Sequence, residues 1–142
     1  MASATRGTRV LYLDSSAVVK LVVRERETDE LRAFIGGADL VSSEIAEVEV
    51  PRAAYLTTEN AETLAHAEAI LRRFSLVALD DELRHEAARA RPPALRSLDA
   101  VHLVSCLRLA RELTAVVVYD RRLTAALRAL GLPIAAPAPG RV

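Results

Sequence analysis

The chain has 142 residues, which fits a single domain spanning residues 1–142 and is long enough to bury a substantial core. Its 19 basic and 19 acidic residues balance, so no net positive field indicates a nucleic-acid partner, and its single cysteine excludes an intramolecular disulfide or a cysteine-based zinc site. No apolar run approaches the roughly 20 residues that cross a bilayer, and the N-terminus lacks the long apolar core of a signal peptide, so we expect a cytoplasmic protein without a membrane anchor.

The first half of the chain alternates between short apolar runs and helical patterns. Ser15 or Ser16 is expected to cap the first helix, and Gly36 or Gly37 to end the second. The pattern predicts strands at residues 10–13 and 39–43, and helices at residues 16–23, 27–37, 44–57 and 60–74.

The second half continues the alternation, with a break at Arg91-Pro92-Pro93. It predicts strands at residues 75–79 and 114–119, a short edge strand at 133–137, and helices at 80–90, 97–112 and 120–131. Strands that alternate with helices indicate an α/β fold, here a parallel sheet of about five short strands flanked by helices on both faces. In such sheets, ligands bind beyond the carboxyl ends of the strands, where the strand order reverses.

Acidic residues stand at the positions where such a site would form. Asp14 directly follows the strand at 10–13, and Asp120 directly follows the strand at 114–119. Asp99 lies in the first turn of the most apolar helix, where a buried acid is costly. Each acid has a structural alternative, because aspartate also caps helices and complements the helix dipole. The sequence leaves both interpretations open for each residue.

The segment around Glu49 is ambiguous. With a period of two residues it is a strand whose glutamates face water, whereas with a helical period Ile45, Val48, Glu49 and Arg52 share one inward face. We prefer the helix, with Ser43 as its cap. Pro51 lies too deep for a first-turn proline, so a kink or an irregular turn is expected just before it.

Four motifs make the chain resemble a known family. They read YLDSSAVVKL, VSSEIAEVEVPRA, LRSLDAVHLVSC and VVVYDRRLTAALRALGL, and together they extend over residues 11–132. In order and spacing they resemble the PIN-domain ribonucleases, and specifically the VapC-type toxins of type II toxin–antitoxin systems. The resemblance implies a single PIN-like domain that cleaves single-stranded RNA by in-line attack of water and leaves a 3′-hydroxyl and a 5′-phosphate.

The resemblance also assigns roles to individual residues. It implies that Asp14, Glu49, Asp99 and Asp120 are the catalytic acids, that Ser16 helps to position Asp14, and that Arg52 accompanies Glu49. Glu44 and Glu47 fall outside the family pattern and are expected to be solvated.

The acids suggest which metal would serve this chemistry. Oxygen ligands without a histidine or cysteine cluster suit Mg²⁺ or Mn²⁺ rather than zinc. Because Mg²⁺ takes only one or two direct carboxylates, some of the acids should act through water. We expect Asp14 and Asp99 to be the principal ligands. Asp120, as a further ligand, and Glu49 would complete the site or orient water.

Basic residues flank the acids in the sequence. Arg96, Arg121 and Arg122 could hold RNA phosphates, although each is equally well explained as a surface arginine. His102 and Cys106 are interpreted as core residues and not as metal ligands. The candidate site therefore consists of the acids and of three arginines that could form an RNA-binding surface beside them.

The resemblance implies protein partners as well. A VapB-type antitoxin would place its C-terminal segment in a groove near the acids, for which helices 27–35 and 60–74 are the candidates, and a homodimer is expected. The alternative is a PIN-fold module that binds RNA or protein with weakened catalysis. It rests on Val118, which stands where many members of the family carry a hydroxyl residue.

Overall fold

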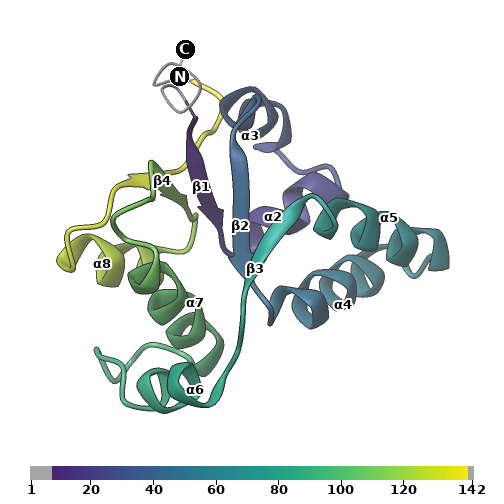
Figure 1. The fold of residues 1–142 in the computed structure, drawn as a ribbon. Coiled ribbons are helices and arrows are strands. Elements are labelled where there is room, and N and C mark those ends of the chain that lie inside the picture. Colours follow the sequence, from purple (N-terminus) through teal and green to yellow (C-terminus); the bar gives the residue numbers. More distant parts are fainter. Residues whose placement is uncertain (1–7, 141–142) are drawn as a thin grey trace.

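The computed structural model describes residues 8–140 and contains one parallel sheet with the strand order β3-β2-β1-β4-β5 (Figure 1). The strands are β1 (Val10–Leu13), β2 (Asp39–Ser43), β3 (Phe74–Val77), β4 (Ala115–Val117) and β5 (Ile134–Ala135). The helices are α2 (Ser15–Val22), α3 (Thr28–Ile35), α4 (Ala46–Thr58), α5 (Ala61–Leu71), α6 (Asp81–Ala88), α7 (Ser97–Arg108) and α8 (Arg121–Ala129). The predicted parallel α/β fold with about five strands is therefore confirmed.

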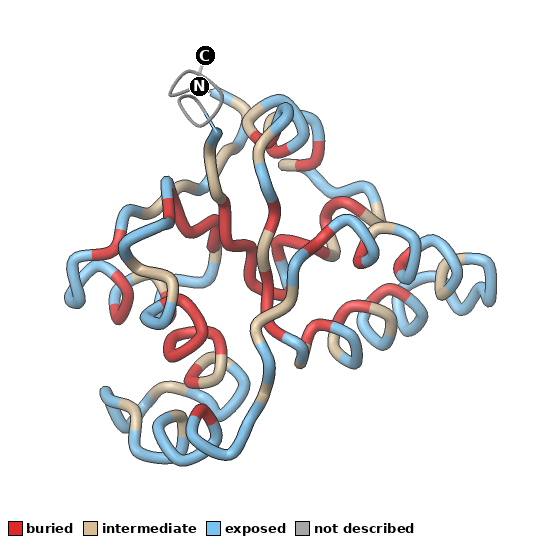
Figure 2. Tube along the Cα trace, in the orientation of Figure 1, coloured by how far each residue is buried: buried red, intermediate tan, exposed pale blue. Residues whose placement is uncertain are grey.

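The sheet separates two layers of helices, because successive side chains of a strand point to opposite faces. Leu11 and Leu13 of β1 pack into the core under α2, α3, α4 and α5, whereas Tyr12 packs into the core under α7 and α8. In Figure 1 the first group of helices lies to the right of the sheet, and α6, α7 and α8 lie to the left. The buried residues accordingly line the central strands and the inner sides of the helices (Figure 2).

The strand order reverses at β1. The chain runs outward from β1 to β2 and β3, then returns to place β4 on the other side of β1. Leu13 is paired with Val117, so the carboxyl ends of β1 and β4 are neighbours. This is the position where ligand sites form in parallel sheets, and it brings the residues that follow these two strands together.

Three local predictions were wrong. Asp14, rather than Ser15 or Ser16, caps α2, because its Oδ1 accepts a hydrogen bond from the backbone N–H of Ala17 at 3.0 Å. The helix α4 runs continuously through Pro51, and the irregular turn lies upstream at residues 44–45. Ser43 does not cap α4. Its Oγ accepts from the backbone N–H of Ile45 and so stabilises that turn.

The helices are short. The helix α4 has 13 residues, and a bilayer span needs about 20. Among the residues that the structure describes, no helix is both long and apolar enough to cross a membrane.

Candidate active site

Asp14 follows β1 and is 4% exposed. Its Oδ1 accepts from the backbone of Ala17, and the Ser16 hydroxyl lies 3.1 Å from both carboxylate oxygens. Burial raises the pKa of Asp14, although the neighbouring His102 side chain and these hydrogen bonds act in the opposite direction. The contact expected between Ser16 and Asp14 is therefore present, and it holds the carboxylate in one orientation.

Asp120 comes three residues after the end of β4, not directly after it as expected, because the strand ends at Val117. Its Oδ2 accepts from the backbone N–H of Leu123 at 2.9 Å and caps α8. Asp14 and Asp120 are thus both helix caps, as the structural alternative proposed. Capping does not exclude a second role, because Oδ1 of Asp120 has no hydrogen bond within residues 8–140.

Asp99 lies in the first turn of α7 and is partly exposed. In the described part of the chain, neither of its carboxylate oxygens has a hydrogen-bond partner. Burial raises its pKa, and the charges of Asp120 and then Glu49 raise it further, while His102 and Arg96 oppose them. Acids from α4, α7 and the end of β4 therefore influence one another electrostatically, as expected for residues that share one cleft.

Glu49 is held by two side chains. Its Oε1 accepts from the Ser15 hydroxyl at 2.6 Å and lies 3.1 Å from His102 Nε2. Burial alone would raise the pKa of Glu49, but the hydrogen bonds with His102 and Ser15 outweigh it and lower the pKa. Glu49 is therefore charged and anchored at one oxygen, and Oε2 has no partner among the described residues.

His102 is buried, at 2% exposed, but it is more than a packing residue. Its Nδ1 lies 2.7 Å from the Tyr12 hydroxyl, and its Nε2 contacts both Ser15 and Glu49. His102 was expected in the core and Ser15 as a helix cap, and their contact with Glu49 was not predicted. The available signal was a polar residue one turn after Asp99 in the most apolar helix.

The inward stripe predicted on α4 is wrong. Val48 is 63% exposed and Arg52 is exposed, while the buried residues of the helix are Ala46, Val50 and Ala54. Glu49 lies at the boundary between the two faces. Arg52 has no hydrogen bond or ion pair within residues 8–140, so its supporting role stays a prediction.

The three arginines proposed to bind RNA are exposed. Arg96 precedes α7 and acts on the pKa of Asp99, while Arg121 and Arg122 begin α8 directly after Asp120. None of them has an ion pair with a described residue. All three guanidinium groups are therefore available to an external anion next to the acids.

The acids match a hard divalent cation by their chemistry. In residues 8–140, no group of three or more histidine, cysteine, aspartate or glutamate side chains is placed to hold a metal ion together. Mg²⁺ needs only one or two direct carboxylates and completes its octahedron with water. The residues present fit such an ion, because Asp14, Asp99 and Asp120 each keep a carboxylate oxygen that no backbone amide occupies.

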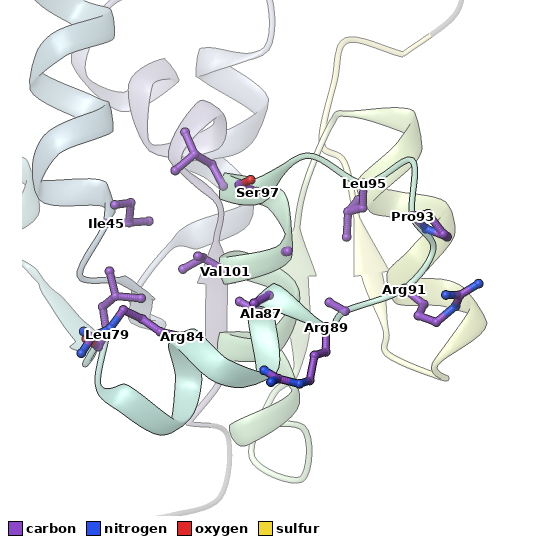
Figure 3. A pocket seen from close by; sticks show the side chains of 14 residues that line it. Ile45, Leu79, Arg84, Ala87, Arg89, Arg91, Pro93, Leu95, Ser97 and Val101 are labelled. Carbon is purple, nitrogen blue, oxygen red and sulfur yellow. The ribbon is translucent and has the colours of Figure 1, made fainter.

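A cavity of about 690 Å³ borders the first turns of α7. Ile45 and Leu79 line it from one side, Val101 lines it from α7, and arginines stand at its rim (Figure 3). Leu98, next to Asp99 in the chain, also lines it and is 45% exposed. An apolar surface therefore borders the helical turn that carries Asp99.

The groove expected between residues 27–35 and 60–74 lies elsewhere. A cavity of about 280 Å³ is present there, lined among others by Ile35, Leu40 and Ile70. Leu40 belongs to the first residues of β2, whereas the acids follow the ends of β1 and β4. The expectation that this groove is near the acids is therefore wrong.

The family model and the curated relatives that match this chain agree on one family. The family model described as "PIN domain" matches residues 11–127. Three curated relatives from Mycobacterium tuberculosis are each named as a ribonuclease. VapC47 is 35% identical and VapC46 is 38% identical, covering 90% and 89% of this chain and 97% of each relative. VapC35 is 36% identical and covers 93% of this chain and 100% of its own length.

Solved structures agree with the fold. VapC20 of Mycobacterium tuberculosis, described as a toxin that cleaves the sarcin–ricin loop, has a TM-score of 0.67 at 13% identity and covers 82% of this chain and 94% of its own. VapBC2 from Rickettsia felis, solved with a DNA fragment from the promoter, has a TM-score of 0.65 at 10% identity. That match covers 90% of this chain and 98% of the other. At these identities the likeness supports the architecture alone.

Proposed function

This chain belongs to the PIN domain family, and within it to the VapC ribonucleases, and from that premise we propose that it is a toxin that cleaves single-stranded RNA and is neutralised by a cognate antitoxin. The observation that carries the proposal is the position of Asp14 and Asp120 at the ends of the paired strands β1 and β4. Asp99 and Glu49 lie within electrostatic reach of that point.

We propose that Mg²⁺, or Mn²⁺ in its place, is the cofactor, with Asp14 and Asp99 as its direct ligands and Asp120 acting on it through water. When bound, such an ion lowers the pKa of a water and neutralises charge on the phosphodiester. Glu49 presents its free Oε2 to the attacking water and accepts a hydrogen bond from it. Arg96, Arg121 and Arg122 bind the flanking phosphates and fix the strand in the cleft.

The alternative, a module with weakened catalysis, has little support in the structure. Val118 is fully buried and packs in the core under α7 and α8, together with Leu103 and Leu123. A valine in that position stabilises the core between the sheet and α7.

We propose that the antitoxin docks in the cavity beside α7. The cavity is largely apolar, and Leu98 offers an exposed aliphatic side chain at its edge. A segment bound there would stand over the mouth of the cleft that contains Asp99, so it would block RNA. A homodimer and a cytoplasmic location complete the proposal.

The decisive experiment compares isosteric variants in a cleavage assay on single-stranded RNA. Asp14→Asn and Asp99→Asn keep side-chain shape but remove a negative ligand, so each should reduce Mg²⁺-dependent cleavage by at least about 100-fold. Asp39→Asn is the matched control, because Asp39 is exposed at the start of β2. If Asp14→Asn cleaves as fast as the parent, the proposed site is wrong.

A further inference from the structure

We propose that His102 is a positioning residue for Glu49, and that a hydrogen-bonded chain Tyr12–His102–Glu49, closed by Ser15, fixes which oxygen of Glu49 faces the substrate. The inference rests on the proposed ribonuclease activity, because it concerns how the acid that orients water is held. It starts from four contacts of 2.6 to 3.1 Å between side chains that lie 34 to 90 residues apart in the sequence.

The acceptor at one end determines where the hydrogens lie. A charged carboxylate such as Glu49 can only accept, so both of its neighbours donate to Oε1. The Ser15 hydroxyl donates at 2.6 Å, and His102 therefore carries a hydrogen on Nε2. In a neutral imidazole the other ring nitrogen is then the acceptor, and the Tyr12 hydroxyl donates to Nδ1 at 2.7 Å. The hydrogen bond of one ring nitrogen thus sets the role of the other.

This chain of hydrogen bonds connects the helices on the two faces of the sheet. Glu49 belongs to α4 and His102 to α7, and these helices lie on opposite faces of the sheet (Figure 1). Tyr12 and Ser15 flank Asp14, which follows β1 at the centre of the sheet. Holding Glu49 through His102 therefore fixes α4 relative to the strand and the helix that carry Asp14 and Asp99.

Burial makes the arrangement specific. Tyr12 and His102 are almost completely buried, and each is the hydrogen-bond partner of the other. A buried donor or acceptor without a partner is costly, which opposes rotation of the ring or the hydroxyl. Because Oε1 of Glu49 receives two donors, only Oε2 remains to accept from a substrate or water.

The kinetic test compares two replacements of His102. Gln places an N–H near the position of Nε2, whereas Leu offers none. We expect His102→Leu to lower kcat by about 10- to 100-fold with KM changed less than about twofold, since a displaced catalytic group costs about that much. His102→Gln should recover most of the loss. Val104→Ala, on the same buried helix, is the control for destabilisation alone.

A double-mutant cycle tests whether His102 acts through Glu49. In a Glu49→Ala background, His102→Leu should reduce cleavage by less than about twofold, because the group that it positions is gone. Losses that multiply in the double variant would overturn the inference, as would a His102→Leu enzyme that matches the parent.

Nitrogen NMR of the labelled histidines tests the hydrogen placement without any activity. We expect Nδ1 of His102 to have the shift of an acceptor nitrogen and Nε2 that of an N–H, with the exposed His66 and His85 as internal references. A hydrogen on Nδ1 would overturn the inference. If the parent protein cleaves no RNA, the proposed function fails, while this spectrum still decides whether the chain of hydrogen bonds exists.

Discussion

Burial and the neighbouring charge of Asp120 together raise the pKa of Asp99, although the two residues stand at the starts of different helices. Like charges disfavour ionisation, and partial removal from water has the same effect. Keeping both carboxylates charged at neutral pH therefore costs folding free energy. The two acids are better explained by ligand binding than by stabilisation of the fold.

The first prediction concerns pH. Because the folded pKa of Asp99 exceeds the usual 3.8, the folded state holds this proton more tightly than the unfolded chain does. The unfolding free energy falls as pH rises through the folded pKa. Asp99→Asn should therefore be more stable than the parent at pH 7, and the difference should shrink on acidification. Urea unfolding at several pH values measures it.

Asp29 provides a control of opposite sign. A hydrogen bond from Arg24, with its charge, lowers the pKa of Asp29, so this contact contributes stability at neutral pH. Asp29→Asn should be slightly less stable than the parent at pH 7. If both variants shift in the same direction, the acids near Asp99 do not repel one another.

The second prediction concerns Mg²⁺. With a Kd of about 1 mM, 10 mM Mg²⁺ should stabilise the fold by about 1.4 kcal/mol through mass action. For a domain near this size, that corresponds to a rise in Tm of about 4 °C. Na⁺ at matched ionic strength should give much less, because screening supplies no inner-shell bonds, and Asp14→Asn should show a smaller Mg²⁺ response. Identical melting curves in the two salts would contradict the metal site.

The positions of Asp14 and Asp120 could be predicted from the sequence because the rule is local and topological. Each acid follows an apolar strand, and parallel strands place their carboxyl ends at one edge of the sheet. Asp99 was predictable for the same reason, since the cap region of α7 is marked by a proline break and a serine.

The surroundings of Glu49 could not be predicted in the same way. The phase of α4 depends on the irregular turn at residues 44–45, which a periodic pattern does not contain, so Val48 and Arg52 were placed on the wrong face. The hydrogen bonds of His102 join β1, α2, α4 and α7. Contacts between such distant segments depend on tertiary packing and leave no spacing in the sequence.

The third prediction separates two neighbouring glutamates. Glu49→Gln keeps the shape of the anchored side chain but removes its charge, so cleavage should fall by about 100-fold or more. Glu47→Gln should retain cleavage within about twofold, because Glu47 is exposed on the same helix and its carboxylate has no hydrogen bond or ion pair within residues 8–140. Single-turnover cleavage of one RNA measures both, and a larger effect at Glu47 would exclude Glu49 from the site.

The fourth prediction concerns the arginines. Arg121→Ala and Arg122→Ala should each weaken RNA binding and make the salt dependence shallower, by about 0.7 in the slope of log K against log salt for each lost phosphate contact. Arg128→Ala, in the last turn of the same helix, is the matched control. Binding is measured in the Asp99→Asn background, so that cleavage does not interfere. Equal slopes for all the variants would show that the start of α8 does not bind RNA.

The last prediction concerns the antitoxin. Leu98 is 45% exposed at the edge of the cavity beside α7, so Leu98→Glu should leave the fold intact and place a charge where an apolar partner side chain would pack. Loss of one buried leucine contact corresponds to about 2 kcal/mol, or about 30-fold in Kd for the antitoxin. Leu130→Glu, 51% exposed at the end of α8, is the control. Cells that co-express the antitoxin should then stop growing with Leu98→Glu but not with Leu130→Glu. If the antitoxin still neutralises Leu98→Glu, and this variant cleaves RNA as fast as the parent, the antitoxin binds another surface.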